Sequence, residues 1–271
     1  MAVHPTAIVE DGAVLGAGVE IGPYCLVGKD VRLGDGVRLM SHVVIGGITE
    51  IGARTLVHPH AVLGGESQIR GNDAEGTRLS LGEDCVVREH VTFSLGSRKS
   101  HAITKIGARG FFMAYSHIGH DCVVGDDCTF ANGAQLGGHV TLGDGVVLGG
   151  LCTVQQFGRI GRGAMLGGMA GANLDVIPFG IAFGSHAMHA GLNIVGLKRR
   201  GVSRSAIHAL RHTYKAVLGS EEGTLAERVA FARREWGSFA EVAEVLDFIE
   251  APAKRKIAPA RRHGADSDAE G

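Results

Sequence analysis

Apolar residues recur at every sixth position along most of this chain, in one series over residues 15–63 and a longer one over residues 106–172. A period of six matches neither the 3.6-residue repeat of an amphipathic helix nor the two-residue alternation of a strand. It is typical of a parallel β-helix, in which the chain turns a corner after every short strand. The longer series consists of Ile106, Phe112, Ile118, Val124, Phe130, Leu136, Leu142, Leu148, Val154, Ile160, Leu166 and Ala172.

A second small or branched residue follows each apolar anchor after four positions. Two inward positions in every six residues predict a triangular prism, with three strands and about eighteen residues in each coil. The cysteines occupy this second position, so we expect them to be small buried core residues rather than disulfide partners or metal ligands. They are Cys25, Cys85, Cys122, Cys128 and Cys152.

Two loops, at residues 65–78 and 94–105, interrupt the repeat. Leu63 and Leu81 are eighteen residues apart, so we expect the first loop to occupy about one coil of chain without a change of phase. Phe93 and Ile106 are thirteen residues apart, so the second loop shifts the phase by one. Long loops on a rigid scaffold often carry function, although a tolerated surface excursion explains them equally well.

The repeat fades after Ala172, with a last irregular coil expected up to about residue 190. From Asn193 the pattern becomes helical, and we expect helices that begin near Ser203 and Thr224 and a third helix over 239–248. The expected parts are a β-helix domain over 1–190, an α-helical domain over 191–250 and a mobile tail over 251–271.

Composition and charge exclude several classes of function. The formal net charge of the 271 residues is −1, so the sequence predicts neither a nucleic-acid partner nor an electrostatic attraction to membranes. No apolar run approaches the length of a membrane span, and the first residues do not resemble a signal peptide. We therefore predict no stable membrane insertion and a cytoplasmic location.

If one coil takes eighteen residues, residues eighteen apart stack at the spacing of parallel strands, about 4.8 Å. This arrangement predicts three neighbouring columns of polar residues. The columns are His120, Gly138 and Gln156; Asp121, His139 and Phe157; and His117, Gln135 and Thr153.

Chemistry is expected at the first two columns. Histidine is well suited to accept a proton near neutral pH. A glycine beside it leaves a backbone N–H open to a developing oxyanion. His120 and Gly138 together therefore favour acyl transfer to a hydroxyl group. The alternative is a solvated outer face, because this chain has fourteen histidines and most histidines are structural.

Four segments resemble the UDP-N-acetylglucosamine O-acyltransferase family of lipid A biosynthesis, over about residues 3–250. They are Val3–Val9, Ser116–Cys122, Gly138–Val140 and Asn193–Gly201. The resemblance implies a left-handed parallel β-helix that assembles as a homotrimer with active sites between subunits. It also implies transfer of a 3-hydroxyacyl chain from the phosphopantetheine of acyl carrier protein to the 3-hydroxyl of a UDP-sugar, with no other cofactor and no metal.

The resemblance also assigns roles to individual residues. His120 would be the general base, Asp121 its orienting partner, and the Gly138 N–H the oxyanion donor. The implied binding residues are His117, His139 and Gln156 in the site, Asn193, Arg199 and Arg200 for the nucleotide or phosphopantetheine, and Gly168, Met169 and His186 for acyl length. Arg199, Arg200 and Arg204 would face acyl carrier protein.

The chain departs from the family pattern at several acceptor-binding positions. The first loop has Ile69 and Gly71 where the family has Asp and Lys, and Arg70 is the candidate replacement for the missing Lys. Further departures are Ser94, Ser97, Gln155 and Val195. These changes leave three alternatives open: a different sugar nucleotide as acceptor, a zinc enzyme of the γ-carbonic-anhydrase type with His117, His120 and His139 as ligands, and a non-catalytic scaffold.

Overall fold

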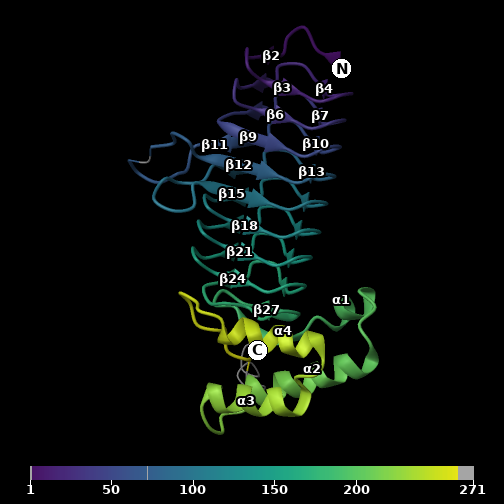
Figure 1. Cartoon of the computed structure of the whole chain (residues 1–271), viewed down its shortest axis with the longest axis vertical. Helices are drawn as coiled ribbons and strands as arrows, with labels where there is room; N and C mark the ends of the chain where they lie inside the picture. The colour runs from purple at the N-terminus through teal and green to yellow at the C-terminus, as the bar shows by residue number, and fades with distance from the viewer. Residues whose placement is uncertain (1, 72, 262–271) are drawn as a thin grey trace, which may run out of the picture.

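The computed structural model describes residues 2–71 and 73–261, which form a long triangular prism of stacked coils with helices at its C-terminal end (Figure 1). Within these residues the strands build three sheets, here called A, B and C. Strands of one sheet pair in parallel, except for β27 with β28 at the end of the prism.

Each of the three sheets takes one strand from each regular coil. Sheet A contains β1 (Ala2–Val3), β4 (Glu20–Ile21), β7 (Arg38–Leu39), β10 (Leu56–Val57), β13 (Val86–Val87), β16 (Phe111–Phe112), β19 (Thr129–Phe130), β22 (Val147–Leu148), β25 (Met165–Leu166), β27 (Gly180–Phe183) and β28 (Met188–Leu192). Sheet B contains β2 (Ile8–Val9), β5 (Leu26–Val27), β8 (Val44–Ile45), β11 (Val62–Gly65), β14 (Thr92–Ser94), β17 (His117–Ile118), β20 (Gln135–Leu136), β23 (Thr153–Val154) and β26 (Gly171–Ala172). Sheet C contains β3 (Val14–Leu15), β6 (Arg32–Leu33), β9 (Ile48–Ile51), β12 (Arg78–Leu81), β15 (Ile103–Ile106), β18 (Val123–Val124), β21 (Thr141–Leu142) and β24 (Arg159–Ile160).

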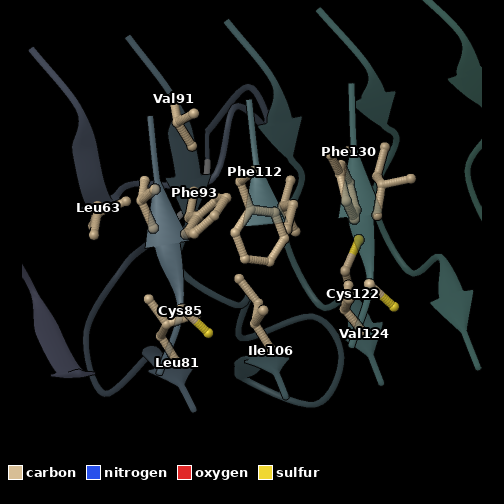
Figure 2. Packing of buried hydrophobic residues seen from close by; sticks show 14 of the residues in the cluster. Leu63, Leu81, Cys85, Val91, Phe93, Ile106, Phe112, Cys122, Val124 and Phe130 are labelled. Carbon is tan, nitrogen blue, oxygen red and sulfur yellow. The ribbon is translucent and has the colours of Figure 1, made fainter. Parts of the chain in front are cut away.

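The interior of the prism is filled by the apolar anchors and the cysteines. Phe93, Phe112 and Phe130 come from three successive coils, and their ring centroids are 5.0 and 5.1 Å apart (Figure 2). All five cysteines are buried and free, and burial raises the pKa of the Cys122 thiol to about 12. A protonated, enclosed thiol behaves as a small apolar group, so the expectation for the cysteines is confirmed.

The first loop differs from the sequence-based expectation. Leu63 pairs with Phe93 in sheet B, whereas Leu81 pairs with Ile51 and Ile106 in sheet C. The loop therefore lies within one coil, between neighbouring strands of sheets B and C, and Leu81 does not stack on Leu63. The hexad phase survives because the insertion is a whole number of hexads, which is why the sequence suggested a complete coil.

The two loops project from the same side of the prism and are bonded to each other (Figure 1). The Gly96 N–H donates to the Arg78 carbonyl at 3.0 Å, where the two loops meet the prism. Further out, Arg98 forms ion pairs with Asp73 and Glu75. The loops thus support each other next to the corner that leads from sheet B to sheet C.

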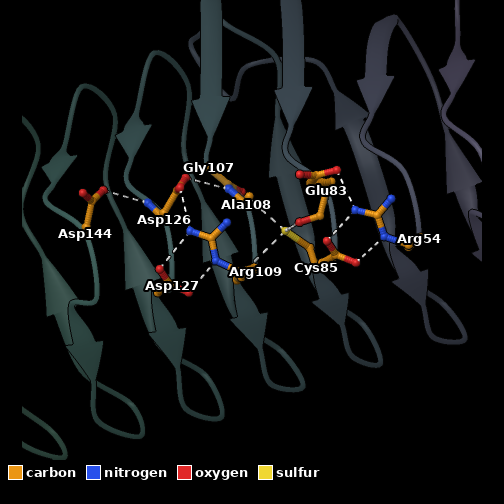
Figure 3. A network of polar contacts seen from close by, with 11 residues as sticks. Arg54, Glu83, Cys85, Gly107, Ala108, Arg109, Asp126, Asp127 and Asp144 are labelled. Carbon is orange, nitrogen blue, oxygen red and sulfur yellow. Dashed lines mark hydrogen bonds and ion pairs between the residues drawn. The ribbon is translucent and has the colours of Figure 1, made fainter. Parts of the chain in front are cut away.

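Another corner, from sheet C to sheet A, carries a ladder of exposed ion pairs (Figure 3). Arg109 binds both Asp126 and Asp127 of the next coil, with nitrogen–oxygen distances of 2.8 Å. Asp126 also accepts a hydrogen bond from the Ala108 N–H. Exposed pairs contribute little individually, so this ladder mainly fixes the stacking register of the corner.

The helices follow the prism as the sequence predicts. They are α1 (Ile194–Arg199), α2 (Arg204–Val217), α3 (Leu225–Trp236) and α4 (Ala240–Glu250). The Ser203 side chain accepts from the Ala206 N–H at the start of α2, and Thr224 forms a capping box with Glu227 at the start of α3. In residues 2–71 and 73–261, no helix combines the length and apolar character that a membrane span requires.

The segment after α4 returns to the end of the prism. Ile257 forms a bridge with Asp175, and the His189 N–H donates to the Pro259 carbonyl at 2.8 Å. The buried His189 side chain adds a hydrogen bond between its Nδ1 and the Ala258 carbonyl. These contacts attach residues 257–261 of the expected mobile tail to the prism, and the rest of that tail, 262–271, lies outside the described residues.

Candidate active site

The candidate catalytic residues lie at the corner where the chain passes from sheet B to sheet C. His120 and Asp121 stand between β17 and β18. Asp121, His139 and Phe157 all have left-handed backbones, with φ of 58°, 60° and 67°. This conformation recurs every eighteen residues and stacks the corners, and the His139 N–H donates to the His120 carbonyl at 2.9 Å. The columns expected for these residues are present.

Asp121 is buried under the second loop and is saturated with hydrogen bonds. The Ser97 hydroxyl donates to Oδ2 at 2.6 Å, and the Ser97 N–H donates to Oδ1 at 3.1 Å. The His120 Nδ1 lies 2.9 Å from Oδ2. Burial alone raises the pKa of the Asp121 carboxyl, but the hydrogen bonds from Ser97 and His120 outweigh it and hold this pKa below its usual value.

The Asp121 carboxylate defines the state of the His120 ring. An ionised carboxylate only accepts hydrogen bonds, so Nδ1 of the neutral imidazole carries the proton and Nε2 keeps its lone pair. His120 itself is only 9% exposed. The ring is therefore fixed in the tautomer that a general base requires.

Gly138 provides the space that the His120 ring occupies. A Cβ atom built on Gly138 would lie 2.4 Å from both Cε1 and Nε2 of His120. Any larger residue would therefore displace the imidazole. Among the described residues, no acceptor is hydrogen-bonded to the Gly138 N–H. An imidazole lone pair and a free backbone donor thus lie next to each other.

His139 lies between the catalytic pair and the next coil. Its Nε2 is 3.9 Å from Oδ2 of Asp121, and its ring stacks on Phe157 with a centroid distance of 4.5 Å. Burial lowers the pKa of the His139 imidazole, Asp121 opposes this change, and His120 and Lys254 lower the pKa further. His139 is therefore held in its neutral form at neutral pH.

A basic segment after α4 packs against Phe157, the last residue of the column that contains Asp121 and His139. The Lys254 ammonium lies 3.8 Å from the centroid of Phe157, on which His139 stacks. The Arg255 guanidinium donates to the Gln156 carbonyl at 2.8 Å and to Oε1 of Gln155 at 3.1 Å. We call residues 253–259 the strap, because they connect the helical domain to the catalytic corner.

The other predicted residues of this corner are close by. His117 lies on β17, its Nδ1 is 2.8 Å from the Thr92 hydroxyl, and burial lowers the pKa of its ring. Gln156 has an exposed side chain in the coil after Gly138. Both residues therefore lie next to the His120 corner, and their role in lining the site remains a prediction.

Asn193 and Arg200, in contrast, lie at a different corner. The Asn193 side chain caps α1 and donates to the Gly163 carbonyl, and Arg200 donates to the Gly145 carbonyl at 2.8 Å. Gly145 and Gly163 follow β21 and β24, at the corner between sheets C and A. The width of sheet C therefore separates these residues, and the exposed Arg199 beside them, from His120 of the same chain.

The residues expected to measure acyl length lie at the two ends of β26. Gly168 and Met169 precede this strand, and the Met169 side chain is 75% exposed. His186 lies beyond the other end, where its Nδ1 is 3.4 Å from Nδ2 of Asn173. Both ends belong to the last coils below the His120 corner.

The structure does not assemble the three histidines of the zinc alternative. Within the described part of the chain, the group with metal-binding geometry is His120, Asp121 and His139, whose ligand atoms lie within 4.8 Å of one another. His117 is bonded to Thr92 instead. The Asp121 oxygens already accept from Ser97 and His120, so a cation would have to break the bonds that hold the base. This donor set fits proton transfer better than zinc.

Sequence reasoning missed four contributors to the site. Ser97 appeared only as a departure from a family motif, yet it is the main partner of Asp121. The Thr104 hydroxyl accepts from the Asp121 N–H at 2.9 Å. Both lie in the second loop, at residues 94–105, whose course the repeat does not determine. Lys254 and Arg255 are about a hundred residues away from their partners, and no repeat relates them.

The residues that depart from the family pattern lie in different environments. Ser94 is buried in β14, Arg70 is exposed, and Val195 is 61% exposed at the start of α1. Gln155 is held by Arg255. None of these positions disturbs the hydrogen bonds of His120 and Asp121.

A prism of hexapeptide coils with a histidine–carboxylate pair at its corner defines the class of hexapeptide-repeat transferases. Models of bacterial transferase hexapeptide repeats match residues 12–47 and 103–138, and a model described as "Udp N-acetylglucosamine O-acyltransferase; Domain 2" matches residues 175–258. The matched residues cover both the repeats and the helical domain.

Relatives along the whole chain identify the family. The acyl-[acyl-carrier-protein]–UDP-N-acetylglucosamine O-acyltransferases of Agrobacterium fabrum and Thiobacillus denitrificans are 43% and 46% identical, over 96% and 94% of this chain and 96% and 98% of theirs. The crystal structure of LpxA from Acinetobacter baumannii superposes with a TM-score of 0.92 at 36% identity, over 95% of this chain and all of that one. The chain therefore belongs to the family of acyl-[acyl-carrier-protein]–UDP-N-acetylglucosamine O-acyltransferases. The predicted left-handed parallel β-helix and acyltransferase class are confirmed.

Proposed function

We propose that this chain transfers a 3-hydroxyacyl group from acyl carrier protein to the 3-hydroxyl of UDP-N-acetylglucosamine, the first step of lipid A biosynthesis, with His120 as general base. The observation that carries this proposal is the contact between the His120 imidazole and Gly138. The intact base–carboxylate pair argues against a non-catalytic scaffold.

The reaction needs one proton acceptor and one oxyanion donor. Nε2 of His120 removes the proton from the sugar hydroxyl as its oxygen attacks the thioester carbon. The tetrahedral oxyanion accepts a hydrogen bond from the Gly138 N–H, and Asp121 stabilises the imidazolium. Collapse breaks the carbon–sulfur bond, and the phosphopantetheine thiolate takes the proton back from His120. No cofactor or metal is required in these steps beyond acyl carrier protein with its phosphopantetheine.

The functional form that we propose is a homotrimer with sites between subunits. One chain keeps His120 and Arg200 on opposite sides of sheet C, so they can act in one site only if a second copy brings its α1 corner to the first copy's His120 corner. Mixed trimers of His120→Ala and Arg200→Ala chains would then regain activity, because some sites receive both intact residues. No recovery on mixing would contradict sites between subunits.

A different sugar nucleotide is the second candidate for the acceptor. Gln155 is tied to Arg255, and Val195 is exposed at the start of α1, where the family resemblance implies contacts with the nucleotide. The discriminating experiment measures acyl transfer from one acyl carrier protein donor to a panel of UDP-sugars. The proposal predicts the highest kcat/KM for UDP-N-acetylglucosamine, and a higher value for another UDP-sugar would reassign the acceptor.

Acyl carrier protein is acidic, and exposed Arg199 and Arg204 offer it basic contacts near α1 and α2. Charge reversal at Arg204 should therefore raise the KM for the acyl donor more than the KM for the sugar nucleotide. A cytoplasmic location remains a prediction from the sequence.

A further inference from the structure

A cavity lies between the strap and the ends of three helices. Its volume is about 510 Å³, within the range that accommodates small organic ligands. The walls come from the ends of α2, α3 and α4, from β24 and from the strap. The helical domain thus contributes α2, α3 and α4 but not α1, and of the residues that line the cavity only Arg255 also contacts the catalytic corner, through Gln156.

Much of the wall is apolar. Val217 and Leu218 close the end of α2, Leu225 begins α3, and Ile249 comes from the last turn of α4. Ile257 of the strap faces them. Such a wall favours the alkyl part of a ligand, because each buried methylene gains free energy on leaving water.

The charged side chains among the described lining residues are all basic. They are Arg159, Arg228, Arg255 and Lys256, and no carboxylate occurs among the described residues that line the cavity. Asp175 neutralises Arg159, with Nε and Oδ2 2.7 Å apart. The contacts of Arg255 are all to carbonyl and amide oxygens. In the described part of the chain, no ion pair joins Arg228, Arg255 or Lys256 to an acidic residue.

Arg228 adds a specific unsatisfied donor. Its Nε is buried and has no hydrogen-bond partner among the described residues. A buried guanidinium N–H without an acceptor is costly. Because Nε itself is covered, a ligand anion would form charge-assisted hydrogen bonds with the terminal nitrogens of this half-buried side chain, which lines the cavity. The cavity thus combines an apolar wall with a cationic group that lacks its acceptor.

We propose that this cavity binds an anionic amphiphile, an alkyl chain with a carboxylate or phosphate head group. The head group binds Arg228 with support from Lys256, and the alkyl chain packs on the ends of α2, α3 and α4. The site is distinct from the acyl-transfer site, and its occupancy does not depend on the proposed reaction. Because Arg255 both lines the cavity and holds Gln156, the ligand would contact the same strap that closes the catalytic corner.

The test is calorimetric titration of the full-length protein with hexanoate, octanoate, decanoate and decyl phosphate, and with inorganic phosphate and decanol as incomplete ligands. We expect each added methylene to raise the affinity about fourfold along the carboxylate series. Decanoate and decyl phosphate should each bind at least about tenfold more tightly than inorganic phosphate or decanol. Similar affinities of decanoate and decyl phosphate would show that the site recognises an anionic head group in general rather than a carboxylate alone. If neither decanoate nor decyl phosphate binds, or if decanol binds as tightly as decanoate, the proposal is overturned.

Variants separate this cavity from the acyl groove of the active site. Arg228→Met keeps an unbranched apolar stem but removes the guanidinium and its charge, and it should weaken decanoate binding at least about tenfold. Arg234→Met, on the same helix but exposed and outside the cavity, is the matched control and should change nothing. Lys256→Met, at an exposed side chain, is a second variant that should fold normally and weaken decanoate severalfold. Acyl transfer should be unchanged in all three, and decanoate binding unaffected by both cavity variants would contradict the site.

Discussion

The His120 imidazole occupies the place of a side chain on Gly138, with Cε1 and Nε2 only 2.4 Å from the position of a Cβ atom. Gly138→Ala should therefore push the ring away from the free N–H and lower kcat at least about a hundredfold, the scale of losing an oxyanion donor. Thermal unfolding should remain cooperative. Gly150→Ala is the matched control, because its Cβ would meet nothing closer than 3.6 Å. Equal kcat values for the two variants would contradict the role of this contact.

Asp121 should be essential for the state of the base. Asp121→Asn removes the charge that fixes the His120 tautomer and stabilises the imidazolium, so kcat should fall at least about a hundredfold. Ser97→Ala deletes the hydroxyl but leaves the Ser97 N–H on the carboxylate, and the loss should be about tenfold. Steady-state kinetics with saturating substrates measures both. A larger loss for Ser97→Ala than for Asp121→Asn would be inconsistent with this arrangement.

The positive charge of Lys254, which packs on the same Phe157 ring as His139, should lower the pKa of the His139 imidazole. Lys254→Met removes a nearby positive charge, so the pKa of the His139 imidazole should rise, whereas Lys254→Arg should leave it nearly unchanged. Titration of the histidine ring signals by NMR measures this directly. An unchanged His139 pKa in Lys254→Met would show that the strap does not act on the corner electrostatically.

Much of the prism could be predicted from the sequence because its repeat is strict. The positions of Ile118 and Cys122 inside the coil, and of His120 beside Gly138, follow from the period of six and the three-sided coil. The first loop was placed wrongly, because the number of residues that it adds is a multiple of six. The eighteen residues between Leu63 and Leu81 therefore equal the length of a full coil, although both residues belong to the same coil.

The remaining parts of the site depend on contacts that no period describes. Lys254 and Arg255 reach the corner only because α4 ends next to the last coil, and the composition of the strap suggested a tail without core residues. The proposal that the site lies between subunits rests on a similar distinction. The sequence placed Asn193 and Arg200 in the site by resemblance, whereas one chain places them across sheet C from His120.

The strap should loosen in acid because of His189. Its Nδ1–H donates to the Ala258 carbonyl, its Nε2 accepts from the Ile177 N–H, and burial lowers the pKa of the ring to about 4. This pKa lies below the usual 6.5, so the contribution to stability is complete above pH 6.5 and is lost as the pH falls from there toward 4. The full loss is roughly 3 kcal/mol of unfolding free energy.

Urea denaturation at pH 7.5, 6 and 5 tests this dependence. The His189→Gln variant should be less stable than the parent at pH 7.5, and its unfolding free energy should fall less between pH 7.5 and pH 5. The other thirteen histidines are common to both proteins, so their contributions cancel in the comparison. Parallel pH dependences of parent and variant would exclude His189 as the acid-sensitive group.

The most direct test of the central claim is the rate of acyl transfer from acyl carrier protein to UDP-N-acetylglucosamine by His120→Ala. This variant keeps Asp121, the Gly138 N–H and the strap, and loses only the proton acceptor. The account predicts that kcat falls at least about a thousandfold while the melting temperature and oligomeric state stay close to those of the parent. A kcat within tenfold of the parent value would contradict the assignment of His120 as the general base.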